Sequence, residues 1–293
     1  MNKTVIALGF FDGVHLGHRV ILNTAVHYAK EHGLVSAACT FDRHPRAFIR
    51  GIAPAMLSTP HRRAELIAEQ GIERVEIITF DKEMAEMSAD DFVVLLKERY
   101  GCVAAVCGDD FRFGKMAKGD ADTLRQHGIE TIVCPPVIGD GERISSTRIR
   151  HLLSDGRVFE AGKLLGREYS LFGVVVDGFK RGRRIGVPTM NLRPDKDLLI
   201  PGKGVYASFV IVGGQKYIAV TNVGTRPTFS QDDIISVESF IIGFNSNIYG
   251  EVARVEFFSK LREERRFNSE EELIAQIEED IKSTRKILGV DDI

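Results

Sequence analysis

Short apolar runs alternate with helix-like patterns through the first half of the chain, and this alternation limits the possible folds more than any other feature. The apolar runs are predicted strands and cover residues 4–10, 35–41, 75–80, 103–107 and 130–134. The segments between them have helical spacing and cover residues 19–32, 60–70, 89–100 and 120–127. This order predicts an α/β domain with a Rossmann-like parallel sheet and helices on both faces. Ligands of such sheets bind in the loops after the carboxyl ends of the strands.

The second half of the chain has a different pattern. After about residue 167, strand-like runs follow one another with turn signals between them, at residues 169–177, 205–212, 215–223, 237–244 and 251–258. Such a series predicts an antiparallel barrel or sandwich. A charged helix over residues 269–288 closes the chain. We therefore expect two domains, residues 1–160 and 161–293, with the boundary in the stretch 155–167 after a helical segment at 146–153.

Composition narrows the classes of function. The chain has 293 residues, 44% of them hydrophobic, and its 39 basic and 41 acidic residues leave a net charge of -2. A general nucleic-acid binder would show a basic excess, so small charged molecules are the expected partners and nucleic acid is not. Nothing in the sequence indicates an oligomer, although one is possible.

The cysteines and the apolar runs indicate the cellular location of the protein. Cys39, Cys102, Cys107 and Cys134 form no CxxC pair and lie in or beside apolar stretches, which is typical of reduced core thiols. We expect no signal peptide, and no apolar run approaches the roughly 20 residues that span a bilayer. We expect a cytoplasmic protein without a membrane partner.

The most informative motif is His15-Leu16-Gly17-His18, which follows the first predicted strand where a helix begins. The helix would point free N–H groups and its positive dipole end into this loop, and both histidines would add donors. A phosphate satisfies this arrangement best. A metal would need a third ligand such as His44, and ordinary surface or capping histidines are the remaining alternative.

Two further segments belong near the same edge of the sheet. The segment Ile144-Ser145-Ser146-Thr147-Arg148-Ile149-Arg150 offers hydroxyls and arginines at a predicted helix start, where they could cap the helix or grip a phosphate chain. The segment Gly108-Asp109-Asp110-Phe111-Arg112-Phe113-Gly114 follows a predicted strand and is either part of the ligand edge or an ordinary polar loop.

The second half carries its own candidate site. Residues 178–186 form a cationic, glycine-bounded stretch that could fold over a polyphosphate or be a solvated hairpin loop. Thr189 and Asn191 lie two residues apart, so on an extended segment they share a face. Their oxygens are ligands that suit Mg²⁺. Glu238 lies in an alternating strand and would by itself be an ordinary surface carboxylate.

Together these motifs resemble a known family. GFFDGVHLGH with ISSTRIR is similar to the HxGH and ISSTxxR pair of the nucleotidylyltransferase superfamily. With TFDRHP at residues 40–45 and GDDFRFG, the set resembles bacterial bifunctional riboflavin kinase/FAD synthetase over nearly the whole chain. The resemblance implies that the first domain transfers the adenylyl group of ATP to FMN, which yields FAD and pyrophosphate. It implies that the second domain phosphorylates riboflavin to FMN. It also implies a small antiparallel β-barrel for the second domain, Mg²⁺ with the ATP, and flavins as substrates and products.

The resemblance assigns roles to particular residues. In the first domain the catalytic set is His15, His18, Ser146, Thr147 and Arg150, the ATP-binding set adds Gly9, Phe10, Asp12 and Gly17, and the flavin-binding pair is Asp110 and Phe111. In the second domain Thr189 and Asn191 would hold the metal, and Glu238 would be the base for the ribityl hydroxyl. There, ATP would be bound by Gly178, Lys180, Arg181, Gly182 and Arg183, and the flavin by Arg262 and Phe267.

Two positions depart from the family pattern. Arg43 replaces the proline of the usual TFxPHP motif, and Gly243 stands where the family has an aspartate five residues after the base. The second departure leaves open a chain in which only the FMN adenylyltransferase is effective. A flavin-nucleotide-binding regulator without turnover is a further alternative, although such a protein would have no need of Glu238.

Overall fold

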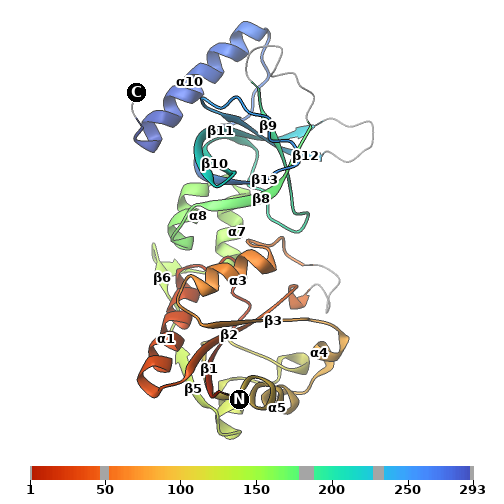
Figure 1. The fold of residues 1–293 in the computed structure, drawn as a ribbon, viewed down its shortest axis with the longest axis vertical. Helices are drawn as coiled ribbons and strands as arrows, with labels where there is room; N and C mark the ends of the chain where they lie inside the picture. Colours follow the sequence, from red (N-terminus) through yellow and green to blue (C-terminus); the bar gives the residue numbers. More distant parts are fainter. Residues whose placement is uncertain (1, 47–52, 178–187, 227–233, 291–293) are drawn as a thin grey trace. The chain divides into compact units, whose positions relative to one another are not determined.

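The protein consists of two compact units, Met1–Ser146 and Thr147–Ile293 (Figure 1). The computed structural model describes residues 2–46, 53–177, 188–226 and 234–290. Each unit is built around its own sheet.

The first unit contains a parallel sheet of five strands in the order β3-β2-β1-β4-β5. The strands are β1 (Thr4–Leu8), β2 (Val35–Phe41), β3 (Arg74–Ile78), β4 (Cys102–Gly108) and β5 (Glu130–Cys134). The described helices are α1 (Leu16–His32), α3 (Pro60–Ala68), α4 (Lys82–Glu86), α5 (Ala89–Tyr100) and α6 (Ala121–Gln126). The predicted α/β sheet is confirmed, with strand ends that move by up to two residues.

Helices pack on both faces of this sheet because β1 sends alternate side chains to opposite sides. Val5 and Ala7 belong to one apolar core, which also holds Leu22 of α1 and Ile67 of α3. Ile6 and Leu8 face the other core, formed with α5 and α6. A continuous apolar run is therefore required in β1, and the sequence has one.

The cysteines lie in these cores as free thiols. All four are buried, and burial raises the pKa of the Cys107 thiol to about 11 and that of Cys102 to about 12. Such thiols are protonated at neutral pH, as expected for core residues.

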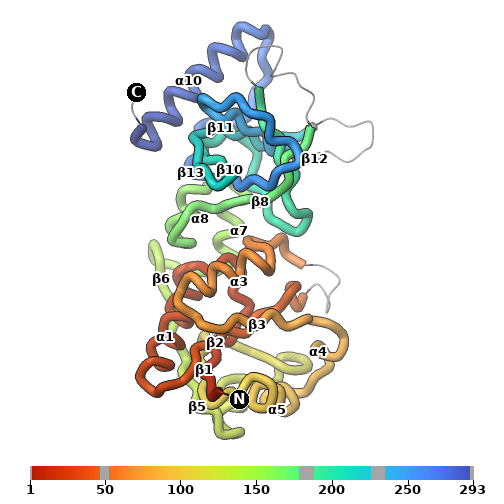
Figure 2. The backbone as a smooth tube through the Cα atoms, in the orientation of Figure 1, coloured from red at the N-terminus to blue at the C-terminus, as the bar shows by residue number. Residues whose placement is uncertain are grey.

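The second unit is a closed antiparallel barrel with the strand order β10-β11-β12-β9-β8-β13, and the tube in Figure 2 traces its ring. The strands are β8 (Tyr169–Val176), β9 (Met190–Pro194), β10 (Gly204–Val212), β11 (Gln215–Arg226), β12 (Ile234–Ile241) and β13 (Val252–Arg262). The predicted barrel and the terminal helix α10 (Glu270–Leu288), capped by Ser269, are confirmed. β9 was expected only as an extended segment and is a full barrel strand.

Two helices precede the barrel, namely α7 (Ser146–Ser154) and α8 (Val158–Leu165). α8 occupies the stretch in which we expected a domain boundary, and it packs against β8 and β13. Its buried residues Val158, Ala161, Leu164 and Leu165 have helical spacing. The same spacing is visible in the sequence and indicates a helix rather than a linker. The boundary at residue 160 stays a prediction.

We expect Leu96→Ala to lower the free energy of unfolding of the first unit by about 2–5 kcal/mol, because it leaves a cavity in the core. Leu96 is 0% exposed, whereas Val94 on the same helix is 45% exposed. Val94→Ala is the matched control and should cost well under about 1 kcal/mol. Denaturant titration measures both, and equal losses would contradict the assignment of the core.

Candidate active sites

The loop after β1 has a strained backbone. Phe11 and Val14 have positive φ angles of 55° and 39°, and Gly13 between them has a φ of 77°. A positive φ is rare for a β-branched residue such as valine and persists only where the surroundings enforce it. Here the Val14 N–H donates to the Phe11 carbonyl at 3.0 Å, and the Gly13 N–H donates to the Ser58 hydroxyl at 3.1 Å.

The buried carboxylate of Asp12 holds this loop in place. It accepts the Leu57 N–H at 3.0 Å, the Ser58 N–H at 3.1 Å and the Ser58 hydroxyl at 3.3 Å. The Asp12 carbonyl accepts the Ser146 hydroxyl at 3.0 Å. The residue thus joins three segments that are far apart in the sequence, and its predicted contact with ATP stays a prediction.

The two histidines of the loop form a compact pair. His15 is the N-cap of α1, and its Nδ1 accepts the His18 N–H at 3.2 Å. The two rings stack with their centroids 3.6 Å apart. Gly17 makes room for this stack, because a Cβ there would lie 3.1 Å from the His15 ring. Among the described residues, no group of three or more His, Cys, Asp or Glu side chains is placed to hold a metal ion.

A cavity of about 840 Å³ opens beside the histidines. It brings together most residues that were assigned to the first site from the sequence, namely Gly9, Phe10, His15, Gly17, His18, Asp110, Phe111 and Ser146. Three residues assigned to this site do not line the cavity. One is Asp12. The others are Thr147 and Arg150, which follow Ser146 on α7 and belong to the second unit.

The cavity has a polar part and an apolar part. The polar part contains the histidines and the first turn of α1, where the positive end of the helix dipole favours an anion. The apolar part is lined by Phe41, Phe80, Met84, Phe92, Phe111 and Phe113. The Phe111 and Phe113 rings lie nearly parallel, with centroids 5.5 Å apart. One ligand with a phosphate group and a flat ring system would satisfy both parts.

Sequence reasoning missed Arg143, which lines this cavity. Its Nη2 lies 2.8 Å from the Asp109 carboxylate and 3.1 Å from that of Asp110. Arg143 directly precedes the ISSTRIR segment at residues 144–150 and lies three residues before Ser146. This position was a signal that could have identified it.

Arg63 was also missed. Its side chain is 0% exposed, lies 4.5 Å over the Phe10 ring and donates to the Phe41 carbonyl. Burial lowers the pKa of its guanidinium to about 10, although the Asp12 and Asp42 carboxylates act in the opposite direction. The helical spacing separates Arg63 from the neighbouring Arg62, because Arg63 precedes the buried Leu66 and Ile67 by three and four residues and so lies on the apolar face of α3.

Arg43, which stands in place of the family's proline, makes a local ion pair. Its guanidinium is exposed and lies 3.4 Å from the Asp42 carboxylate. The exposed ion pair contributes little to stability.

In the barrel, strand register places the second set of candidates in one row. Asn191 of β9 lies opposite Glu238 of β12, and Glu238 lies opposite Asn222 of β11. The row continues through Val205 of β10 to Arg262 of β13. Asn191 is buried, at 5% exposed. Amide and carboxylate groups from strands far apart in the sequence thus lie side by side.

A second cavity, of about 460 Å³, lies beside β9. Thr189 and Met190 line it, together with the segment that follows β12, including Phe244, Asn245, Asn247 and Tyr249. Gly243 comes just before that segment with a φ of 72° and open space around the position of a Cβ. Glycine adopts this left-handed conformation without strain, so the departure from the family pattern suits the turn.

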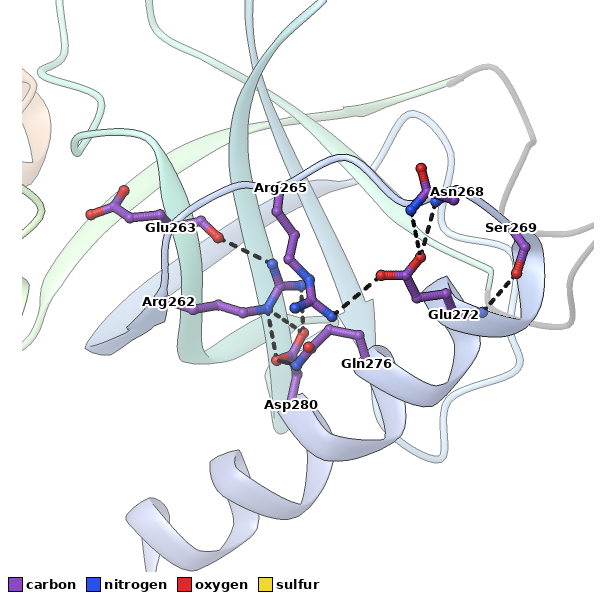
Figure 3. A network of polar contacts seen from close by, with 8 residues as sticks. All are labelled: Arg262, Glu263, Arg265, Asn268, Ser269, Glu272, Gln276 and Asp280. Carbon is purple, nitrogen blue, oxygen red and sulfur yellow. Dashed lines mark hydrogen bonds and ion pairs between the residues drawn. The ribbon is translucent and has the colours of Figure 1, made fainter.

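The remaining candidates are the ATP-binding and flavin-binding residues of the second domain. Gly178, Lys180, Arg181, Gly182 and Arg183 lie outside the described residues. The Arg262 guanidinium is held by Asp280 of α10 (Figure 3). It also lies 5.7 Å from the Phe267 ring centroid.

These features define a two-domain protein with a nucleotide-binding type of α/β domain and a separate polar site on a barrel. The model of the FAD synthetase family matches residues 1–148, and that of the riboflavin kinase family matches residues 165–288. The chain belongs to the bifunctional riboflavin kinase/FMN adenylyltransferase family.

Relatives support this membership over nearly the full length. The proteins of that name from Bacillus subtilis and Listeria monocytogenes are 37% and 36% identical, over 95% and 97% of this chain and 90% and 92% of theirs. A solved structure from Streptococcus pneumoniae, described as a macrolide-efflux protein, has a TM-score of 0.91 at 34% identity and covers 97% of this chain and 94% of its own. No helix in the described ranges of our chain is long and apolar enough to cross a membrane.

We expect Asp12→Ala to release the loop after β1, because two buried N–H groups would lose their acceptor. Each such loss costs about 1–3 kcal/mol. Hydrogen exchange at the Leu57 and Ser58 amides should become faster, which mass spectrometry of peptides can measure. Asp122→Ala removes an exposed carboxylate and is the control. Unchanged exchange at residues 57 and 58 would contradict the role of Asp12.

Proposed function

We propose that the first domain transfers the adenylyl group of ATP to FMN at the large cavity, and that the second domain phosphorylates riboflavin at the row of Asn191, Glu238 and Asn222. The observation that carries the first assignment is the single cavity that joins a histidine-lined helix N-terminus to an aromatic pocket. Family membership supports both reactions.

The adenylyl transfer needs no nucleophilic side chain. A phosphate oxygen of FMN attacks the α-phosphorus of ATP, a new P–O bond forms, and the bond to pyrophosphate breaks. His15, His18 and the N–H groups at the start of α1 stabilise the negative charge that develops on the phosphates. Ser146 would join them, and Thr147 and Arg150 would do so by the family motif. Positioning of the two substrates supplies the rest of the acceleration.

We assign the aromatic part of this cavity to the flavin. A flat isoalloxazine ring matches stacked phenylalanines, which provide apolar area and an offset-stacking surface. Asp110 and Phe111 would border that ring. Arg143 lies against Asp110 and would be well placed to contact phosphate when the substrates enter.

In the second domain Glu238 would orient the ribityl hydroxyl and accept its proton as that oxygen attacks the γ-phosphorus of ATP. Thr189 and Asn191 fit Mg²⁺, because both offer neutral oxygen donors and one of them is a buried amide beside a carboxylate. When bound there with ATP, Mg²⁺ would neutralise charge on the transferred phosphate. Residues 178–183 would contact the nucleotide by the family motif.

Both activities, riboflavin kinase and FMN adenylyltransferase, belong to this chain by its two family domains and its named relatives. The alternative of an effective adenylyltransferase alone rests on Gly243, and a turn position that suits glycine gives no reason for a lost kinase. Because both reactions consume ATP and supply intracellular cofactors, we also propose a cytoplasmic location.

We expect Glu238→Ala to reduce FMN formation from riboflavin by about 10²–10⁴-fold, because the base is removed. FAD formation from supplied FMN should be unchanged, since it takes place in the other domain. Chromatography of flavins after incubation with ATP and Mg²⁺ measures both. Loss of both activities would contradict the division of labour, and wild-type FMN formation would contradict the role of Glu238.

His18→Ala should reduce FAD formation from FMN by about 10²–10³-fold, as expected when a donor to developing negative charge is lost. FMN formation from riboflavin should persist. His32→Ala, in the last turn of the same helix, is the matched control and should leave both rates unchanged. The assignment fails if the two histidine variants behave alike.

A further inference from the structure

A short segment, residues 263–269, connects the last barrel strand to helix α10 and is tied to that helix at both ends (Figure 3). At its start, Arg262 makes a bidentate contact with Asp280, with Nε 3.0 Å and Nη2 2.8 Å from the carboxylate oxygens. Asp280 is 4% exposed and also accepts from Gln276 at 2.9 Å. A planar, doubly bonded pair of this kind holds its partners in one geometry.

The other end of the connecting segment is held by Glu272. The Asn268 N–H donates to its carboxylate at 3.0 Å, and the Glu272 N–H donates to the Ser269 hydroxyl at 3.2 Å. Arg265 adds an ion pair to the same carboxylate at 4.0 Å. The segment is therefore restrained although it has no regular secondary structure.

From this segment Glu264 reaches back to the barrel. Its Oε1 accepts a hydrogen bond from the Asn222 amide nitrogen at 3.1 Å. Gly224 provides the space, because a Cβ at that position would overlap the Glu264 carboxylate. Since a carboxylate can only accept, this contact fixes which side of the Asn222 amide carries the nitrogen.

Asn222 is the direct cross-strand neighbour of Glu238. Side chains paired in this way have Cβ atoms about 4.5–5.5 Å apart. The orientation of the Asn222 amide therefore sets the polar surroundings of the Glu238 carboxylate on one side, while Asn191 does so on the other.

We propose that Glu264 is a positioning residue for riboflavin phosphorylation, which acts by holding the Asn222 amide beside Glu238. The inference rests on the proposed role of Glu238 as the base. Glu264 is exposed, and a hydrogen bond at such a site contributes little to the stability of the fold. Substitution of Glu264 should therefore change the activity rather than the stability. The restrained connecting segment brings the residue to the barrel without a large loss of chain entropy at each turnover.

The test measures kcat and KM for FMN formation in Glu264→Ala, Asn222→Ala and the double variant. Partners that orient functional side chains typically contribute about 10–100-fold, so we expect each single change to lower kcat by at least about tenfold with little change in KM for ATP. Because the two residues act as one unit, the double variant should lose no more than the single variants. Glu264→Gln keeps an acceptor oxygen and should retain most of kcat.

Two further variants separate positioning from a general structural effect. Gly224→Ala should displace the Glu264 side chain and reproduce the loss, because its Cβ would overlap the carboxylate and lie 3.1 Å from the Asn222 amide nitrogen. Glu263→Ala is the matched control, because this neighbouring carboxylate pairs with Lys260 at 2.7 Å and not with Asn222. FAD formation from FMN, measured in every variant, checks that the chain remains folded and active.

A wild-type kcat in Glu264→Ala would overturn the proposal, as would multiplied losses in the double variant or a Gln variant as poor as the Ala variant. The Glu238→Ala experiment separates this failure from failure of the proposed function. If Glu238→Ala abolishes FMN formation and Glu264→Ala does not reduce it, only the role of Glu264 is wrong. If Glu238→Ala forms FMN normally, both assignments fall.

Discussion

The two-residue repeat of β-strands is the constraint on which both domains depend. In the first domain it divides β1 between two apolar cores, so that this strand is buried on both sides and its loop begins from a rigid base. In the barrel the same repeat, together with ring closure, places Asn191, Glu238 and Asn222 on one face and in one row. A slip of one residue in register would turn these side chains to the opposite face and dismantle the site.

Each site depends on polar contacts between segments that are distant in the sequence. The strained loop after β1 keeps its conformation because the buried Asp12 carboxylate holds residues 57 and 58, while its carbonyl receives Ser146. On the barrel, Arg262 and Asp280 restrain the connecting segment from which Glu264 reaches Asn222. In both cases hydrogen bonds to carboxylate oxygens hold together segments that are far apart in the sequence.

Much of the fold was accessible from local patterns. The alternation of apolar runs and helical spacing predicted the parallel sheet and its helices, and the change of pattern after residue 167 predicted the barrel. α8 lies in the stretch where a domain boundary was expected, although its buried residues follow helical spacing. β9 was not predicted as a strand because it is short, and its pairing with β8 and β12 is a tertiary property.

The candidate sites divide in the same way. The HxGH motif, ISSTRIR, the pair Thr189 and Asn191, and Glu238 were identified because motif residues are close together in the chain or match a family pattern. Arg63 shares the apolar face of α3 with Leu66 and Ile67. Its contacts with the Phe10 ring and the Phe41 carbonyl join segments that are distant in the sequence, so no local pattern specifies them. Arg143 became visible only through its contacts with Asp109 and Asp110. Glu264 belongs to a segment with a family resemblance, but its contact with Asn222 is a tertiary one.

By itself the sequence determined the two kinds of domain, the helix that begins at the histidine motif, and the family to which the motifs point, because these depend on the periodicity and spacing of neighbouring residues. Only the tertiary structure decided that Asp12 faces the backbone of residues 57 and 58, that the aromatic side chains gather into one cavity, and that Glu264 lies against Asn222. Those outcomes depend on strand register and on contacts across tens of residues, which no local pattern specifies.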